Sequence, residues 1–407
     1  MQKFSWRWQM WQWNKRRLAL LWLLLTACNS ASGPDASSGA AARSEAEEAL
    51  QKACRYLWNQ QGEDGGWHSR TYALLRSGQA LTPFILQVLL EAPADVCPRP
   101  AGGLAKALQF IRSQSNQQGV IGLADPDILE YPNYSTAYAL RCLVRAGEEV
   151  DRQLIAKMQD YLVGQQFRAE NGFPQTELAF GGWGFGGPVQ AGSPGHMDLP
   201  HTRRVLQALQ ESGLEDPALT ERAMVFLRLL QRHPDETRPQ PLPAGQGEAP
   251  GGESPFDGGF HFSPVVLGAN KGRLQGQGAD AYFRSYATAT CDGVLALLAA
   301  GASADDQRVA AAIRWLERHP RWDYPEGIPQ DHPEDWGKAL HFYHLAVRAE
   351  AFQALSWPGD WKAELSSQLV PQQRGDGSFI NSRSALMKED DPLLSTALAA
   401  TALRSMH

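Results

Sequence analysis

Apolar residues recur at helical spacing through most of the chain, and strand-like alternation is scarce. Two kinds of segment alternate from residue 44 to the C-terminus. The first kind is amphipathic with charged faces and covers residues 44–61, 102–115, 152–166, 217–232, 305–318 and 360–373. The second kind is more apolar, is rich in Ala and Leu, and covers residues 82–91, 135–146, 201–212, 286–300, 339–355 and 393–406. The pattern predicts an all-α protein built from helix pairs.

Polar-faced helices fit an outer shell, and nearly apolar helices fit an inner layer that is buried on most sides. Their regular alternation predicts a closed barrel of six inner helices wrapped by six outer helices. An open superhelix is the structural alternative, because internal repeats also build solenoids.

The links between the helices are unequal. Those from inner to outer helices are short, whereas those from outer to inner helices are long and rich in Gly and aromatic residues, with the Pro/Gly-rich stretch 233–256 the longest. We expect the long loops and the N-termini of the inner helices to share one rim, which would be the functional face. The predicted N-caps of these helices are Thr82, Ser135, either His201 or Thr202, and Ser395.

The N-terminal segment has the pattern of an export signal. Residues 1–17 carry five basic side chains and no acidic one, and residues 18–25 form an apolar run too short to span a bilayer as a helix. The run ends in Leu25-Thr26-Ala27-Cys28, which resembles the bacterial lipobox, in which the Cys is lipidated and becomes the mature N-terminus. An ordinary signal peptide with an incidental Cys is the alternative.

These features predict a lipoprotein signal peptide at residues 1–27 and lipidation at Cys28. Residues 28–43 are small and polar and are expected to form a flexible tether to a folded domain at 44–407. Residue 29 is Asn, not the Asp expected for retention in the inner membrane. We therefore expect an outer-membrane protein that faces the periplasm, anchored through its lipid.

Composition excludes two broad classes. Of the 407 residues, 43% are hydrophobic, which is ample for a packed core and excludes disorder throughout. The formal net charge is −6, and it is more negative without the basic N-terminal segment. Nucleic-acid binding by bulk electrostatics is therefore not expected.

Four cysteines remain beyond Cys28. Cys54 lies in the first predicted helix and Cys97 just beyond the second, so an antiparallel pair would bring them together, and export would permit a disulfide bond between them. Cys142 and Cys291 lie within apolar helical patterns and are expected to be buried free thiols.

Two segments, Gln61-Gly62-Glu63-Asp64-Gly65-Gly66-Trp67 and Gln373-Arg374-Gly375-Asp376-Gly377-Ser378-Phe379, resemble the repeat Gln-x(2–5)-Gly-x-Trp/Phe. That repeat marks squalene-hopene cyclases, oxidosqualene cyclases and the β subunits of protein prenyltransferases. The resemblance covers residues 44–407 and implies an α/α toroid of six helix pairs. It also makes an isoprenoid or another lipid the expected ligand.

The chemistry of these families is only partly retained. The cyclases protonate an alkene with an Asp-x-Asp-Asp-Thr motif, to which Asp198-Leu199-Pro200-His201-Thr202 is similar at its first and last positions only. The cluster Glu389-Asp390-Asp391 does not match that register and is interpreted as a solvated rim or a helix cap. Cyclisation started by protonation is therefore not expected.

The prenyltransferases hold zinc with an Asp-x-Cys on one inner helix and a His on the next. Asp292 and His344 match two of these ligands, but Val294 stands at the Cys position. Catalytic zinc usually has three protein ligands, so no cofactor is expected, with zinc at Asp292 and His344 as the alternative.

Further residues could form a ligand cavity. His341 and His344 share a helix face, and a satisfied buried pair competes with a direct role in binding. Aromatic residues that could line an apolar cavity, or else simply pack, occupy rim loops or inner-helix starts and are Tyr134, Trp183, Tyr286 and Tyr343.

Three functions remain open. The first is a monomeric envelope lipoprotein that binds an isoprenoid or other hydrophobic ligand in the toroid. The second is a terpene cyclase or prenyl-transfer enzyme whose catalytic residues are Asp198, His201, Asp292 and His344. The third is a scaffold that binds an envelope protein or a glycan through its rim loops.

Overall fold

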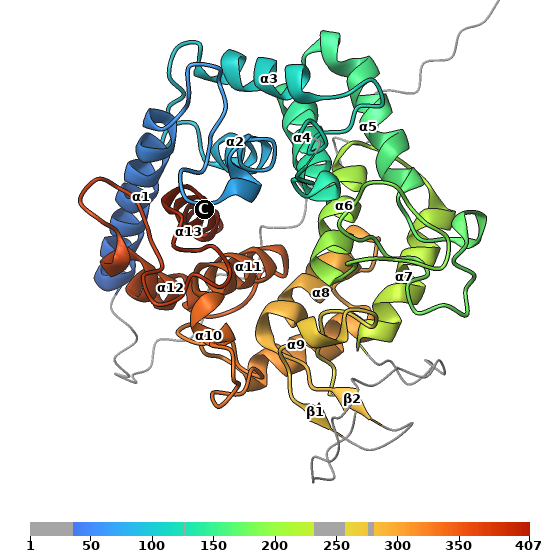
Figure 1. The fold of residues 1–407 in the computed structure, drawn as a ribbon. Helices are drawn as coiled ribbons and strands as arrows, with labels where there is room; N and C mark the ends of the chain where they lie inside the picture. The colour runs from blue at the N-terminus through green and yellow to red at the C-terminus, as the bar shows by residue number, and fades with distance from the viewer. Residues whose placement is uncertain (1–35, 126, 232–256, 276–280) are drawn as a thin grey trace, which may run out of the picture.

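The computed structural model describes residues 36–125, 127–231, 257–275 and 281–407, with side chains from residue 45 onward. Two rings of helices form the described part of the chain (Figure 1). The outer helices are α1 (Ala36–Asn59), α3 (Gly103–Gln114), α5 (Arg152–Gly164), α7 (Pro217–Gln231), α9 (Gln307–Arg318) and α12 (Trp361–Leu369). The inner helices are α2 (Leu81–Glu91), α4 (Pro132–Ala146), α6 (Leu199–Glu211), α8 (Ala287–Ala299), α11 (His341–Ala354) and α13 (Pro392–Arg404).

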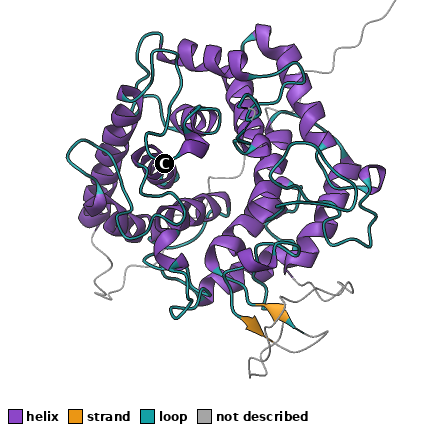
Figure 2. Cartoon of the chain, in the orientation of Figure 1, coloured by secondary structure: helices purple, strands orange, loops and turns teal. Residues whose placement is uncertain are grey.

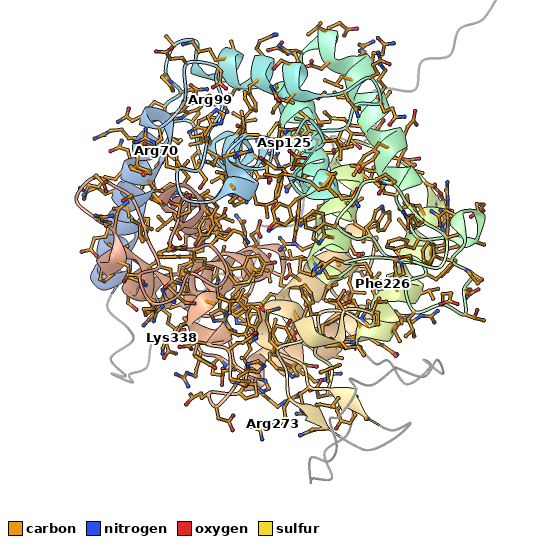
Figure 3. All side chains as sticks on the ribbon, in the orientation of Figure 1. Arg70, Arg99, Asp125, Phe226, Arg273 and Lys338 are labelled. Carbon is orange, nitrogen blue, oxygen red and sulfur yellow. The ribbon has the colours of Figure 1, made fainter. Side chains whose placement is uncertain are left out.

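Smaller elements lie in the loops (Figure 2). A short helix, α10 (Trp336–Ala339), precedes α11, and the antiparallel strands β1 (Leu274–Gln275) and β2 (Tyr282–Phe283) pair in the loop before α8. Single 3-10 turns occur at Ala73–Leu75, Glu149–Asp151, Ala169–Asn171, Leu267–Ala269 and Val370–Gln372.

The ring is closed. Each inner helix contacts the next in the order α2, α4, α6, α8, α11 and α13, and α13 returns to contact α2. The first helix, α1, also packs against α12 and α13. The predicted α/α toroid of inner and outer helices is thereby confirmed, and the open superhelix is excluded.

The glutamines of the repeat join successive units of the ring. The side-chain amide of Gln61 donates to the carbonyls of Gly65 in its own loop and Gly103 in the next outer helix. Gln166 and Gln231 make the equivalent pair of bonds. Gln373 donates to Gly377 and to Ala49 of α1, so the last unit is tied to the first by the same contact.

Glycines of the repeat lie so close to the neighbouring outer helix that a side chain would collide with its backbone. Gly181 has a φ of +86°, and a Cβ atom there would lie 1.9 Å from the carbonyl oxygen of Arg222 in α7. Gly65 has a φ of +90° and meets Lys106 of α3 in the same way. Only glycine combines this backbone conformation with so close an approach to the neighbouring helix.

The predicted N-caps are wrong because the inner helices begin earlier than expected. Asp198 caps α6 and Asp391 caps α13, in each case with Pro within the first two helical positions. Thr82 and Thr202 instead accept the backbone N–H of Trp67 and Trp183 from the rim loops, at 2.9 and 3.0 Å. These hydroxyls attach the long loops to the inner helices.

The first described helix begins earlier than the predicted domain boundary. Helix α1 begins at Ala36, within the predicted tether, whereas Cys28 and the 233–256 loop lie outside the described residues.

The four described cysteines are all free thiols. Cys142 and Cys291 are buried free thiols, as predicted. Cys54 and Cys97 are free and buried, and their thiols hydrogen-bond to each other, which raises the pKa of Cys54 and lowers that of Cys97. The two residues are therefore neighbours, as expected, but they carry no disulfide bond.

Candidate functional site

Asp198 lies at the N-terminus of α6 and is the acceptor of several hydrogen bonds. It receives the backbone N–H of His201 at 2.9 Å, Nδ1 of His201 at 2.9 Å and Nε2 of His196 at 3.2 Å. Burial alone would raise the pKa of Asp198, but the electrostatic interaction with His201 and the hydrogen bonds from His196 and His201 outweigh it and hold that pKa far below its usual range. The carboxyl group is therefore an anion and not a proton donor.

His201 is oriented by this carboxylate. With Nδ1 directed at Asp198, the second ring nitrogen, Nε2, is buried and has no hydrogen-bond partner among the described residues. The imidazole is 4% exposed, and its centroid lies 4.0 Å from that of Tyr134. A histidine held by a carboxylate at one nitrogen presents the other as a hydrogen-bond or proton acceptor.

Aromatic side chains extend from His201 along the inner helices. Tyr134 stacks on Tyr138 with centroids 6.0 Å apart, and Tyr138 contacts Phe84 of α2 at 5.2 Å. On the other side, Phe185 lies 5.9 Å from His201. We call Phe84, Tyr131, Tyr134, Tyr138 and Phe185 the aromatic belt; all but Tyr138 remain partly exposed. Partial exposure on otherwise buried helices indicates that solvent reaches this side of the ring.

Lys271 stands near the belt and was missed by sequence reasoning. Its ammonium group lies 4.2 Å from the ring centroid of Phe262 and 4.6 Å from that of Trp336, and it donates to the carbonyl of Ala269. Burial lowers the pKa of Lys271 to about 8. No motif marks this residue, because loop packing alone brings the two rings together.

Asp292 is held by neighbours on two other helices. Arg203 donates to Oδ1 at 2.8 Å, and the hydroxyl of Tyr343 donates to Oδ2 at 2.8 Å. Burial raises the pKa of Asp292, although Arg203 opposes this shift. Burial also raises the pKa of Tyr343 well above its usual range, so the phenol keeps its proton and remains a donor.

His344 has a separate environment from Asp292. Its Nε2 contacts the backbone carbonyl of Arg321 at 3.1 Å, and burial lowers its pKa to about 3. His341 contacts the side-chain oxygen of Gln372 at 2.8 Å, and burial lowers its pKa to about 4. Both histidines are therefore neutral near pH 7.

A zinc ion fits these residues poorly. Both Asp292 oxygens are engaged, the position two residues on is Val294, and His344 bonds elsewhere through Nε2. Within the described ranges no group of three or more His, Cys, Asp or Glu side chains could hold a metal ion.

Trp183 and Tyr286 are buried behind the surface that a ligand could touch. Trp183 is fully buried, and its indole N–H donates to the carbonyl of Leu162 at 2.7 Å. Tyr286 is 1% exposed, whereas Tyr134 and Tyr343 keep part of their surface open. The last two are therefore the better placed to touch a ligand.

Two members of the acidic cluster before α13, Glu389 and Asp391, are buried caps, and Asp390 is half-buried. Glu389 accepts the backbone N–H groups of Phe342 and Tyr343 at the start of α11, and burial raises its pKa to about 7. Asp391 caps α13, and Asp390 accepts a hydrogen bond from the hydroxyl of Tyr72. The cap interpretation thus holds for Glu389 and Asp391, and the expectation of solvation is wrong for these two residues, which are 1% exposed.

A network of ion pairs links all six inner helices and was not predicted. Glu350 of α11 accepts from Arg203 at 2.6 Å, Arg404 at 3.2 Å and Arg204 at 3.3 Å. Arg404 also pairs with Glu91 of α2, which in turn pairs with Arg141 of α4. The charged network consists of Glu91, Arg141, Arg145, Arg203, Arg204, Glu211, Asp292, Glu350 and Arg404. Most of its members lie toward the C-terminal ends of the inner helices.

Solved structures of two kinds resemble the chain. The type II terpene cyclase MstE from Scytonema, in its apo form, is 14% identical with a TM-score of 0.51, covering 89% of this chain and 98% of the cyclase. MstE in complex with geranylgeranyl dihydroxybenzoate is 15% identical with a TM-score of 0.50, covering 90% and 97%. The α-1,6-mannanase GH76A from a Salegentibacter species is 10% identical with a TM-score of 0.50, covering 88% and 98%.

These similarities establish the α/α toroid fold and nothing finer. No family profile matches the chain, and no curated protein matches it. No helix in the described part of the chain is both long and apolar enough to cross a membrane. The architecture is therefore that of type II terpene cyclases and GH76 mannanases, which act on very different substrates.

Proposed function

We propose that the protein binds an isoprenoid or a similar hydrophobic ligand within the ring, against the aromatic belt. The observation that carries the proposal is the row of aromatic rings on α2 and α4 that leads to His201 and is partly exposed at Phe84 and Tyr134. Flat aromatic faces suit the apolar body of such a ligand, while the unpartnered Nε2 of His201 suits a hydroxyl or phenol at its polar end. The fold is shared with a cyclase whose complex contains a geranylgeranyl compound.

The chemistry available at this site differs from alkene protonation. Asp198 is fixed as an anion by two histidines, and Asp292 is paired with Arg203. If the ligand is transformed, the group we assign is His201, which would accept a proton from a ligand hydroxyl while Asp198 stabilises the resulting imidazolium. In this proposal Asp292 and Tyr343 position the wall of the site and do not start a reaction.

Location is a further part of the proposal. We infer lipidation at Cys28 and anchoring to the outer membrane on its periplasmic side, because the sequence of residues 1–28 has the required charge and hydropathy pattern. A monomeric toroid held at a membrane surface would meet lipid ligands without crossing an aqueous space.

Glycan binding is the second candidate. It is favoured by the fold shared with the mannanase and by polar groups beside the belt, such as Tyr343 and His201. Sugar rings also stack on aromatic faces, so the belt alone does not separate the two ligand classes. No zinc or other cofactor is part of either proposal.

The test is native mass spectrometry of the chain from residue 36 onward, exported in soluble form, before and after organic extraction. Titration with geranylgeraniol and with α-1,6-mannotriose follows. We expect isoprenoid binding that weakens about tenfold in Tyr134→Ala and is unchanged in the matched variant Tyr324→Ala, since Tyr324 lies outside the belt. Binding of the sugar alone would support the glycan candidate. Failure to bind either ligand would contradict both and favour the scaffold function.

A further inference from the structure

A pocket lies away from the aromatic belt, between α9, α11 and α12. Its volume is about 320 Å³, and four aromatic side chains line it: Trp322, Phe352, Trp357 and Trp361. Trp322 stacks on Trp361 with centroids 6.1 Å apart, and Phe352 stacks on Trp357 at 4.1 Å. The pocket is separate from the aromatic belt and shares no residue with it.

Arg348 lines this pocket and makes no ion pair with the described residues. It is 1% exposed, and its guanidinium lies 5.1 Å from the ring centroid of Trp322 and 4.8 Å from that of Phe352. Nη2 donates to the carbonyl of His319 at 2.9 Å, but Nε and Nη1 have no partner in the described part of the chain. None of the ion pairs found among the described residues includes Arg348.

Arg348 differs from the buried arginines of the charged network, because those arginines form ion pairs. Arg203, which is fully buried, pairs with Asp292 at 2.8 Å and Glu350 at 2.6 Å. A buried cation without a counter-ion lowers the free energy of unfolding, so an ordinary structural position would carry an apolar residue. An unpaired guanidinium that lines an open pocket indicates that an anionic group of a ligand completes the site.

The mouth of the pocket carries the opposite charge. Glu317, Asp360 and Glu364 line it and are exposed, and Glu364 also accepts the indole N–H of Trp322 at 3.1 Å. These carboxylates would repel a ligand with several negative charges, but they would attract a positive group. The charges thus run from a cation at the base to anions at the mouth, with aromatic walls between them.

We propose that this pocket binds a small zwitterion that contains a ring, such as an aromatic amino acid. Its carboxylate binds Nη1 and Nε of Arg348, its ring packs against the aromatic cluster on the side of the partly exposed Trp357, and its ammonium group lies near the exposed carboxylates. The proposal rests on the outer pocket alone, so it is independent of ligand binding at the aromatic belt.

The test is isothermal titration of the purified full-length protein with three matched probes: L-phenylalanine, 3-phenylpropanoate and L-phenylalanine amide. We expect L-phenylalanine to bind most tightly. The amide, which lacks the carboxylate, should bind at least about tenfold more weakly, and phenylpropanoate, which lacks the ammonium, about threefold more weakly. Arg348→Met should reduce L-phenylalanine binding at least about tenfold.

The controls separate binding from folding. Since Arg348 makes no ion pair, Arg348→Met should leave the Tm unchanged or raise it, whereas Arg203→Met, which removes one ion pair each from Asp292 and Glu350, should lower it. Trp357→Ala, at the pocket edge, should weaken L-phenylalanine binding with Arg348 intact. Absence of binding by all three probes, or equal affinity of Arg348→Met for L-phenylalanine, would overturn the proposal. Equal affinity for phenylpropanoate and L-phenylalanine would overturn its zwitterion component.

Discussion

The two ends of the inner helices differ in whether the buried groups that can carry charge have partners of opposite charge around them or aromatic rings. Toward the C-terminal ends, the charged network engages the carboxylates of Glu91, Glu211 and Glu350 with arginines from neighbouring helices. Toward the N-terminal ends, His201 keeps a free ring nitrogen beside partly exposed aromatic rings. Both regions are buried, so burial alone does not identify a functional site. An unpartnered ring nitrogen beside partly exposed aromatic rings is a more specific sign, and among the described residues only the N-terminal ends have it, at His201.

The largest effect is expected in the charged network. Burial would raise the pKa of Glu350, but Arg203, Arg204 and Arg404 pull it well below its usual range, so the folded protein depends on the anion. Glu350→Gln leaves three arginines undercompensated and should lower the free energy of unfolding by about 3–5 kcal/mol. Urea unfolding at pH 7 measures this loss.

A matched change at the edge of the network tests that explanation. The side chain of Glu211 is 30% exposed, and its buried partner Arg141 keeps its ion pair with Glu91 in Glu211→Gln, so we expect a loss of about 1 kcal/mol or less. Equal losses of unfolding free energy in Glu350→Gln and Glu211→Gln would mean that burial does not determine how much each carboxylate stabilises the fold.

The next effect contrasts the loops at the two ends. Gly181, in a rim loop, combines a positive φ with a Cβ position that collides with the carbonyl of Arg222. Gly213, in a short link at the opposite end, has a φ of +74° but open space around the Cβ position. Gly181→Ala should therefore cost about 2–4 kcal/mol and Gly213→Ala about 1 kcal/mol, as measured by denaturant unfolding.

Acid sensitivity should distinguish His344 from the paired groups. Its folded pKa of about 3 lies below the unfolded value near 6.5, so the unfolded state binds the proton first as the pH falls. The folded state is then destabilised from about pH 6.5 downward, by about 2 kcal/mol at pH 5. His344→Gln, which keeps a donor toward the Arg321 carbonyl, should remove this loss.

The comparison is made between unfolding free energies at pH 7 and pH 5 in the two proteins. Glu389 has a folded pKa of about 7, above its unfolded value, so its contribution is lost as the pH rises and opposes that of His344. It is present in both proteins and cancels. An unchanged pH dependence in His344→Gln would show that His344 is not the group responsible.

The sequence was informative about the fold because each local signal has a local physical cause. The glutamines of the repeat bond to the following outer helix, and the glycines fit against it, so a recurring motif specifies a recurring contact. The helix caps were misplaced because Thr82 and Thr202 serve the rim loops, while the Asp–Pro signals at Asp198 and Asp391 mark the true starts.

Less of the candidate site than of the fold could be predicted from the sequence. Asp198, His201 and Tyr134 were identified and do lie together, because two of them are close in sequence and the third lies on the adjacent helix. The charged network depends on pairs such as Glu350 with Arg203, which are far apart in sequence, and the outer pocket depends on how α9, α11 and α12 pack together. Charged residues on otherwise apolar inner helices were the visible signal of the network, but their partners follow from packing around the ring.

The smallest stability effect, and the sharpest test of the free nitrogen, is expected in Asp198→Asn. Asparagine caps helices about as well as aspartate, so the loss of unfolding free energy should be only about 0.5–1.5 kcal/mol. The carboxylate that favours a proton on Nδ1 of His201 is replaced by an amide that can also donate, so nitrogen-15 NMR should show a mixture of ring tautomers in place of one. Asp391→Asn, a cap with no histidine partner among its described hydrogen bonds, should cost a similar amount and leave His201 unchanged. A single, unaltered tautomer in Asp198→Asn would mean that Asp198 does not determine which nitrogen of His201 faces the ligand.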